Sequence, residues 1–377
     1  QCECYSLFFD SFNEGAMRCS LLTSLAMGEL TKFTQQVEHA PFAARAIPAG
    51  DLGPDGTFYV MGGRNLVVHF QADVWKSPDG LKWQQVTKSA PWGARGYMDA
   101  VFLSNGTMVL MGGQDLSKCF SDVWVSHDGA ETWEQLTDSA PWGIGPDGTR
   151  VGRSAYKTLV VNDQIYMVGG DHGSFYNRKF FGDVWMSPDG GRSWEMKFNG
   201  TAQPAGKAWR PRAGMQVVKV KDSLFFMGGD NDQYSSFHFE RYNDIWRSDD
   251  MGASWGYVGQ AAWGNRTGHQ CFSPDDACVY CVGGQGNPEC NKKSNLLYHD
   301  VWKSCDGAKT WSLVAEDAFG CDPTAKCGDA AYNCGLDDFL TRRKDGRWWL
   351  MAGDAEKSAP FPMSNGVWTL EDDQVLV

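Results

Sequence analysis

Tryptophan recurs at fixed positions of a repeated unit, and this repetition limits the possible folds more than any other feature of the chain. Fifteen of the seventeen tryptophans occupy three positions of the unit. The first position ends an Asp-Val-Trp type of triplet, at Trp75, Trp124, Trp185, Trp246, Trp302 and Trp368. The second follows an Asp-Gly turn, at Trp83, Trp133, Trp194, Trp255 and Trp311. The third lies in the next loop, at Trp92, Trp142, Trp209 and Trp263.

Each unit predicts four short β-strands, which we call a, b, c and d in chain order. Strand b is apolar throughout and ends in Gly-Gly, as in residues 108–113, which indicates that both of its faces are buried. Strand c carries the triplet, strand d starts at the second tryptophan, and strand a starts after an arginine, as after Arg95. Four-stranded units arranged radially are the blades of a propeller. The sequence therefore predicts an all-β fold, a six-bladed β-propeller.

The sixth unit lacks its own strand d, because the chain ends soon after Trp368. The missing strand is predicted at the other end, where residues 33–45 parallel residues 83–95 with one inserted residue. We expect residues 32–37 to pair with residues 367–370, which closes the ring and removes an open sheet edge. The propeller then spans residues 30–371, between a disulfide-tied cap at 1–29 and a tail at 372–377.

Twelve cysteines predict disulfide bonds in an oxidising compartment, because one isolated Cys-x-x-Cys pair cannot complete a zinc site. They are Cys2, Cys4, Cys19, Cys119, Cys271, Cys278, Cys281, Cys290, Cys305, Cys321, Cys327 and Cys334. Cys271 and Cys278 are expected to face each other across a hairpin, and the other pairings stay open. Three sequons, at Asn105, Asn199 and Asn265, together with a chain beginning at Gln1, favour a secreted glycoprotein.

Charge and hydropathy exclude several classes of partner. The formal net charge of -12 argues against nucleic acid and anionic membranes. No apolar run approaches the roughly 18 residues of a membrane span.

The Gly-Gly, Asp-x-Trp and downstream Trp positions resemble the Kelch repeat. The turn between strands c and d resembles the Asp-box of sialidases and other propellers, in the segments 77–83, 126–133, 187–194, 248–255 and 304–311. These resemblances imply the propeller fold and carry little information about activity, since propellers include enzymes, lectins and scaffolds. Tyr97, Asp99 and Tyr156 are the candidates for a sialidase-like site, but no glutamate clearly partners either tyrosine.

Two rings of side chains are predicted at one mouth of the central channel. The aromatic ring comprises Phe42, Trp92, Trp142, Trp209, Trp263 and Phe319, which would stack on sugar rings or else wedge between blades. The basic ring comprises Arg45, Arg95, Arg153, Arg212 and Arg266, with Arg342 or Arg343 as the sixth member. These arginines would bind a carboxylate or sulfate, or else pair with an aspartate of a triplet such as Asp73 or Asp122.

The leading functional hypothesis is a secreted, non-catalytic propeller that binds a glycan or an extracellular protein, as a building block of an extracellular or cell-surface assembly. No blade shows polar groups that the repeat leaves unexplained. The alternative is a glycan-processing enzyme, sialidase- or epimerase-like, at the arginine-lined mouth. Two long cysteine-rich loops, 285–299 and 318–336, are candidate recognition loops. Asp230 and Asp232 are weak candidates for calcium, and no other cofactor is expected.

Overall fold

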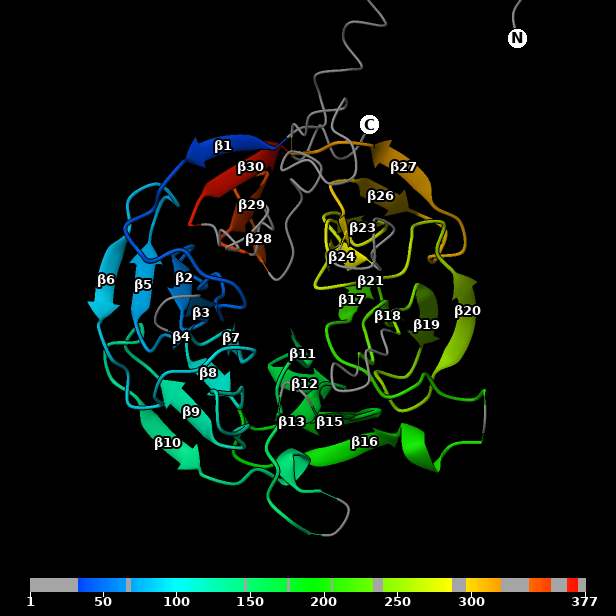
Figure 1. Cartoon of the computed structure of the whole chain (residues 1–377), viewed down its shortest axis with the longest axis horizontal. Helices are drawn as coiled ribbons and strands as arrows, with labels where there is room; N and C mark the ends of the chain where they lie inside the picture. Colours follow the sequence, from blue (N-terminus) through cyan, green and yellow to red (C-terminus); the bar gives the residue numbers. More distant parts are fainter. Residues whose placement is uncertain are drawn as a thin grey trace, which may run out of the picture.

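Six antiparallel sheets radiate from a central axis in the computed structural model (Figure 1). The structure describes residues 33–65, 69–145, 148–174, 177–204, 206–232, 240–286, 296–319, 339–353 and 365–371. The predicted cap at 1–29, the tail at 372–377 and most of the two cysteine-rich loops lie outside these residues.

The blades follow one another in chain order, each with its first strand nearest the axis (Figure 1). Blade 1 has β2 (Phe58–Met61), β5 (Val74–Ser77) and β6 (Gln84–Thr87). Blade 2 has β7 (Asp99–Phe102), β8 (Met108–Met111), β9 (Val123–Ser126) and β10 (Glu134–Thr137). Blade 3 has β11 (Lys157–Val161), β12 (Gln164–Val168), β15 (Asp183–Ser187) and β16 (Glu195–Asn199).

The remaining blades repeat this order. Blade 4 has β17 (Gln216–Val220), β18 (Ser223–Met227), β19 (Asp244–Ser248) and β20 (Gly256–Gln260). Blade 5 has β22 (Gln270–Phe272), β23 (Val279–Val282), β26 (Val301–Ser304) and β27 (Ser312–Ala315). Blade 6 has β28 (Leu340–Lys344), β29 (Arg347–Met351), β30 (Val367–Glu371) and, from the start of the chain, β1 (Thr34–Val37). In blade 1, two isolated bridges, Ala49–Met61 and Leu52–Phe58, stand in place of a regular inner strand.

The ring closes as the sequence predicts. β1 pairs antiparallel with β30, with Thr34 opposite Thr369 and Val37 opposite Val367. The Gln36 amide also donates a hydrogen bond to Thr369 Oγ1 at 2.9 Å. Figure 1 shows this first strand lying at the outer edge of the blade formed by the last three strands. The two ends of the propeller are therefore held together by a shared sheet.

Short elements extend the loops between strands b and c. They are β3 (Arg64–Asn65) with β4 (His69–Phe70), β13 (Asp171–Ser174) with β14 (Asn177–Phe180), and β24 (Gln285–Gly286) with β25 (Leu296–Leu297). β24 also pairs with β21 (Arg266–Thr267), which precedes the inner strand of blade 5. Two 3₁₀ turns, Pro141–Gly143 and Gly200–Ala202, follow outer strands. No helix among the described residues is long and apolar enough to cross a membrane.

The inner strands start later than predicted. β7 begins at Asp99, four residues after Arg95, and β11 begins at Lys157, four residues after Arg153. Between arginine and strand, the second residue after each arginine has positive φ: Ile47, Tyr97, Ala155, Gly214 and Gly268. This left-handed residue turns the chain before the strand can begin.

The core lies between blades. The apolar residues of strand b are buried in each blade, for example Met108–Met111 and Ile165–Val168. One cluster joins Tyr59 and Met61 of blade 1 to Leu110 of blade 2, and the other clusters pack neighbouring sheets in the same way. The Gly-Gly pairs allow close approach: Gly113 has φ 87° and donates to the carbonyl of Arg153 in the next blade at 2.9 Å.

Two disulfides join cysteines of blade 5, and they differ from the predicted pairing. Cys271 bonds Cys281, and Cys278 bonds Cys305. The prediction that Cys271 faces Cys278 was wrong because the register of β22 and β23 places Cys271 opposite Cys281. Cys278 instead precedes β23, whose first residue Val279 pairs with Ser304, and so it lies beside Cys305.

Cys119 corrects a second cysteine prediction, because it is a buried free thiol. Burial raises the pKa of this thiol to about 11, which keeps it protonated at neutral pH. The other seven predicted disulfide cysteines, Cys2, Cys4, Cys19, Cys290, Cys321, Cys327 and Cys334, lie outside the described residues.

Candidate functional site

The five repeat arginines are buried inside the blades. Each forms an ion pair with the aspartate of its own blade's triplet: Arg45–Asp73, Arg95–Asp122, Arg153–Asp183, Arg212–Asp244 and Arg266–Asp300. Each arginine also donates to the carbonyl of the first glycine of the Gly-Gly pair. The same aspartate accepts a hydrogen bond from the triplet tryptophan at 2.7–2.9 Å.

This geometry corrects the prediction that the arginines bind a ligand. The Arg45 side chain is 0% exposed, and its guanidinium reaches both Asp73 oxygens, at 2.7 and 2.9 Å. Burial acts to raise the pKa of Asp73, but the hydrogen bond and charge of Arg45 outweigh burial, so this pKa is lowered. Because a buried charge needs a partner, we assign the arginines a structural role, in which their ion pairs and hydrogen bonds connect segments of the same blade. The sixth candidate, Arg342, is different and lies on the channel.

The predicted aromatic ring is also interior. Phe42, Trp92, Trp142, Trp209 and Trp263 are at most 2% exposed. Each packs edge-on against the second-position tryptophan of the blade that follows it, as Trp142 does against Trp194 at 6.0 Å between ring centroids. Buried rings in this arrangement stabilise the fold and offer no face to a sugar. The packing alternative therefore replaces the prediction that these rings bind a ligand.

The turns between strands c and d are held by their own aspartates. In blade 5, Ser304 Oγ donates to Asp306 at 3.0 Å, and Asp306 accepts from Thr310 N and Oγ1 at 3.0 and 2.7 Å. The backbone N–H of Thr310 contributes most to lowering the pKa of Asp306 to about 2. The Trp311 indole closes the turn by donating to the Ala308 carbonyl at 3.2 Å. These contacts give the turns a structural role.

Protein cations occupy the loop aspartates that were candidates for calcium. Asp230 accepts from Arg178 and from Thr267, both at 2.7 Å, and Asp232 accepts from Arg241 at 3.1 Å. Burial first, and then the neighbouring Asp230, raise the pKa of Asp232 to about 6. A calcium ion would need ionised, unoccupied carboxylates, so the structure does not favour calcium here.

A chamber of about 320 Å³ lies where the inner strands converge on the axis. Its polar lining comes from Asp51 of blade 1, Asp99 of blade 2, Lys157 and Thr158 of blade 3, Gln270 of blade 5, and Thr341 and Arg342 of blade 6. Its apolar lining comes from Val101, Phe102, Leu159, Val160, Cys271, Phe272 and Trp348. This volume is at the lower end of small-molecule sites, which span roughly 300–1,000 Å³.

Lys157 is the distinctive group of the chamber. It begins β11 and is half-buried, and its ammonium makes no ion pair or hydrogen bond with any residue that the structure describes. Burial is the main cause that lowers the pKa of Lys157, and Arg342 lowers it further, while Asp99 and Asp51 act in the opposite direction. A lysine without a fixed partner, held in a partly open pocket, can bind an anion or act as a nucleophile.

The other charged groups of the chamber have fixed partners. Arg342 Nε donates to Asp51 Oδ1 at 2.7 Å, and Asp51 Oδ2 accepts from the backbone N–H of Phe102 at 3.0 Å. Asp99 accepts from Thr158 Oγ1 and from the N–H of Ala100. These contacts fix both carboxylates on the wall, so the position of negative charge around Lys157 is set by the fold.

The tyrosines of the sialidase-like hypothesis do not reach the chamber as nucleophiles. Tyr156 is buried, its hydroxyl donates to the Met111 carbonyl, and burial raises its pKa well above the ordinary value. Of the three candidates, Asp99 alone lines the chamber.

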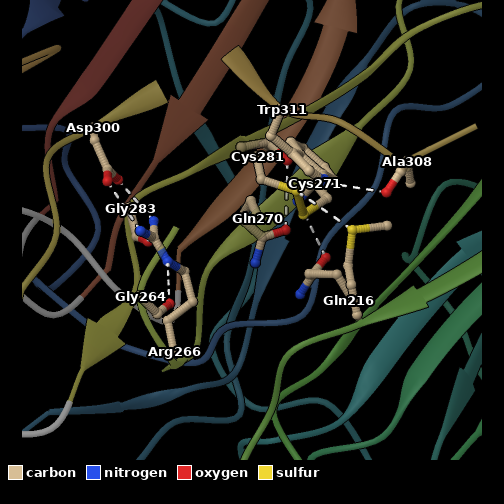
Figure 2. The surroundings of a disulfide bond; sticks show 12 residues. Gln216, Gly264, Arg266, Gln270, Cys271, Cys281, Gly283, Asp300, Ala308 and Trp311 are labelled. Atoms are coloured by element: carbon tan, nitrogen blue, oxygen red, sulfur yellow. Dashed lines mark hydrogen bonds and ion pairs between the residues drawn. A yellow bond between two sulfur atoms is a disulfide. The ribbon is translucent and has the colours of Figure 1, made fainter. Parts of the chain in front are cut away.

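Cys271, which forms a disulfide with Cys281, lines the same chamber. Figure 2 shows Gln216 beside this disulfide. The Gln216 side-chain oxygen accepts from the backbone N–H of Cys271 at 3.5 Å. His269 lies close by and is completely buried, so its pKa is well below the ordinary value. His269 and the two sulfurs form the candidate metal cluster of the described residues, but the disulfide already occupies both sulfurs.

Sequence reasoning missed Lys157, although a signal was present. The fourth residue after each repeat arginine is Ala49, Asp99, Lys157, Gln216 or Gln270. Four of these five side chains are polar where the strand begins nearest the axis, and three residue types occur among the four. Variation at one register position of an otherwise regular repeat indicates a site that the repeat does not explain.

The three predicted glycosylation sites, Asn105, Asn199 and Asn265, are exposed. Asn105 accepts from the N–H of Thr107 at 2.9 Å within a tight turn. Their accessibility agrees with the requirement for a surface position, and glycosylation itself stays a prediction.

Comparisons with known proteins add a fold and no activity. No protein-family model matches the chain, and no curated protein matches it. Many solved structures are similar. One of them, the structure of YjhT, has a TM-score of 0.64 and 16% sequence identity, and the match covers 88% of this chain and 96% of that chain. At this identity the likeness supports the six-bladed propeller alone.

Proposed function

We propose that the protein is an extracellular, non-catalytic propeller that binds glycans, and that the axial chamber holds one terminal sugar. The observation that carries this proposal is the half-buried Lys157, without a fixed partner, in a chamber of about 320 Å³. A built cavity with a few convergent polar groups is the usual form of a small-molecule site.

The lining suits a sugar of monosaccharide size. Asp99, Gln270 and Thr341 offer hydrogen-bond acceptors and donors to hydroxyl groups, and Lys157 offers a positive charge. Phe102 and Phe272 give apolar surface for the C–H faces of the ring. An acidic sugar is favoured because Lys157 would then gain the partner that the protein does not supply.

Two features support the extracellular and non-catalytic parts of the proposal. The two disulfides of blade 5 are typical of oxidising compartments. Asp51 is bound by Arg342 and Asp99 by Thr158, so neither carboxylate is a free acid or base. A protein partner, and a role in an extracellular assembly, stay secondary proposals for the loops at 285–299 and 318–336.

The alternative is a glycan-processing enzyme, and the lowered pKa of Lys157 beside Asp99 is the observation that favours it. A lysine amine in a small polar chamber could transfer a proton to or from a bound sugar. The arginine-lined mouth no longer supports this alternative, because those arginines are buried in ion pairs.

Calorimetric titration of the oxidised protein with free neutral and acidic monosaccharides tests both functions. We expect one binding site that prefers acidic sugars and at least a tenfold loss of affinity in Lys157→Met, the order of one charge-assisted hydrogen bond of about 1.5–3 kcal/mol. Lys118→Met, on an exposed loop, should bind normally. NMR of the same mixtures monitors conversion: turnover would favour the enzyme, and absence of binding to every sugar would contradict the chamber as a glycan site.

A further inference from the structure

We propose that Lys157 captures small carbonyl compounds in the chamber as a reversible imine. This inference rests on the proposed function, because it assigns a chemical class of ligand to the same chamber. The ligands would be small hydroxyaldehydes or hydroxyketones, such as the open-chain form of a reducing sugar, or keto acids.

The position of Lys157 makes its amine accessible as a nucleophile. Lys157 Nζ lies on the innermost strand of blade 3, and the fold supplies no ion-pair partner within the described chain. Other lysines make such contacts: Lys76 with Glu131 at 3.6 Å, and Lys197 with Glu195 at 3.2 Å. Lys157 is thus available to a ligand that enters the chamber.

The charged groups of the chamber act on the amine of Lys157. Asp51 of blade 1, Asp99 of blade 2 and Arg342 of blade 6 line the chamber together with Lys157, and the charge of Lys157 also acts on the buried His269 of blade 5. Burial disfavours the ammonium form, and a desolvated lysine amine is an activated nucleophile. The two carboxylates stabilise the positive charge that develops on nitrogen during imine formation.

The reaction balances without an oxidant or a reductant. The lone pair of neutral Nζ attacks the carbonyl carbon, which forms a C–N bond and a carbinolamine. The carbonyl oxygen then leaves as water, taking up the two protons that Nζ loses, and a C=N bond remains. The reverse reaction with water releases the ligand and restores the amine.

The space around the amine suits a small ligand. The chamber is large enough for a few carbon atoms with their hydroxyls, and Gln270 and Thr341 lie on the wall across the axis in blades 5 and 6. Side-chain amide and hydroxyl groups there can hold the hydroxyls of a carbonyl ligand. The chamber therefore combines a nucleophile, charge stabilisation and a polar recognition wall.

Reductive trapping tests the inference. The full oxidised chain is incubated with glycolaldehyde in one arm and pyruvate in the other, each with cyanoborohydride, which reduces the imine to a stable secondary amine. Intact and peptide mass spectrometry then locate the adduct. We expect saturable labelling of Lys157, at least tenfold faster than labelling of the exposed Lys88 and Lys207, which serve as internal controls. The faster arm distinguishes a hydroxyaldehyde from a keto acid.

The pH profile and two variants make the result decisive. Trapping at Lys157 should reach half its maximum below the ordinary lysine pKa of about 10.4. Lys157→Arg keeps the charge and cannot form an imine, so it should bind free acidic sugars and lose the adduct. Asp99→Asn removes a charge that raises the pKa of Lys157, so it should move the half-maximum of trapping at Lys157 to lower pH without changing trapping at Lys88.

Failure of this inference differs from failure of the proposed function. If sugars bind to the chamber but Lys157 is trapped no faster than Lys88 in either arm, the imine is wrong and the glycan site stands. If neither binding nor trapping occurs, both proposals are wrong. Trapping at Lys157 that does not saturate would also overturn the inference, because it would show simple surface reactivity.

Discussion

Replacement of Arg153 by methionine should destabilise the propeller strongly, because it leaves a buried aspartate without its counter-charge. The Arg153 side chain is 1% exposed and pairs with Asp183 through bonds of 2.6 and 2.9 Å. It also donates to the carbonyls of Trp142 and Gly169, each at 3.0 Å. Methionine fills much of the same volume, so the change isolates the polar contacts.

The expected loss follows from breaking a buried ion pair on one side, which costs about 3–5 kcal/mol. At an unfolding entropy of about 2.1 cal/mol/K per residue, a chain of this length should lose about 4–6 °C in Tm. The double variant Arg153→Met/Asp183→Leu should lose less than the single variant, since it removes both charges together.

Urea unfolding followed by tryptophan fluorescence measures this loss. Arg150→Met is the matched control, because Arg150 lies three residues away and its contact with Asp138, at 3.3 Å, is exposed. The control should change stability by less than about 1 kcal/mol. If Arg153→Met were as stable as the control and had lost sugar binding, the structural role of the arginines would be refuted in favour of ligand binding.

Three further predictions concern charge and crosslinks. Replacing Cys278 and Cys305 by alanine should lower the free energy of unfolding by about 3.5 kcal/mol, and replacing Cys271 and Cys281 should lower it by about 2.7 kcal/mol. The first loss is larger because that disulfide closes a longer loop, with a sequence separation of 27 against 10. Denaturation curves that rank the pairs in the opposite order would contradict this. Burial lowers the pKa of Lys157, so the unfolded chain binds more protons than the folded chain near the ordinary lysine pKa. The free energy of unfolding should therefore rise with pH as the pH approaches that value. Urea titrations from about pH 8 to 10 should show this rise in the wild type and not in Lys157→Met. The pKa of Asp306 is lowered to about 2, so its contribution to stability is present above its ordinary pKa and is lost as the pH falls through about 2. The difference in Tm between the wild type and Asp306→Ala should therefore shrink in acid. A difference that stays constant with pH would argue against the turn contacts.

The fold could be predicted because each blade repeats the same pattern of strands and turns in the sequence. Apolar runs, Gly-Gly pairs and triplets mark the strands, and the match of residues 33–45 to residues 83–95 predicts the closing strand. These signals are periodic, and periodicity needs no knowledge of tertiary contacts.

The candidate site could not be predicted by the same means. Periodicity singles out residues such as Arg95 and Trp142, which recur because the packing between strands and blades requires them. Lys157 occurs once, and its significance comes from three other blades that place Asp51, Asp99 and Arg342 in the same chamber. The disulfide pairs failed for a related reason, since their partners depend on the register between β22 and β23.

The most direct test of the central claim is a glycan-array comparison of the intact, oxidised protein with Lys157→Met. We expect selective binding by the wild type, strongest for terminal acidic sugars, and loss of that binding in a variant that remains folded. Equal binding by the two proteins would place recognition outside the axial chamber and contradict the proposal that the chamber binds the sugar.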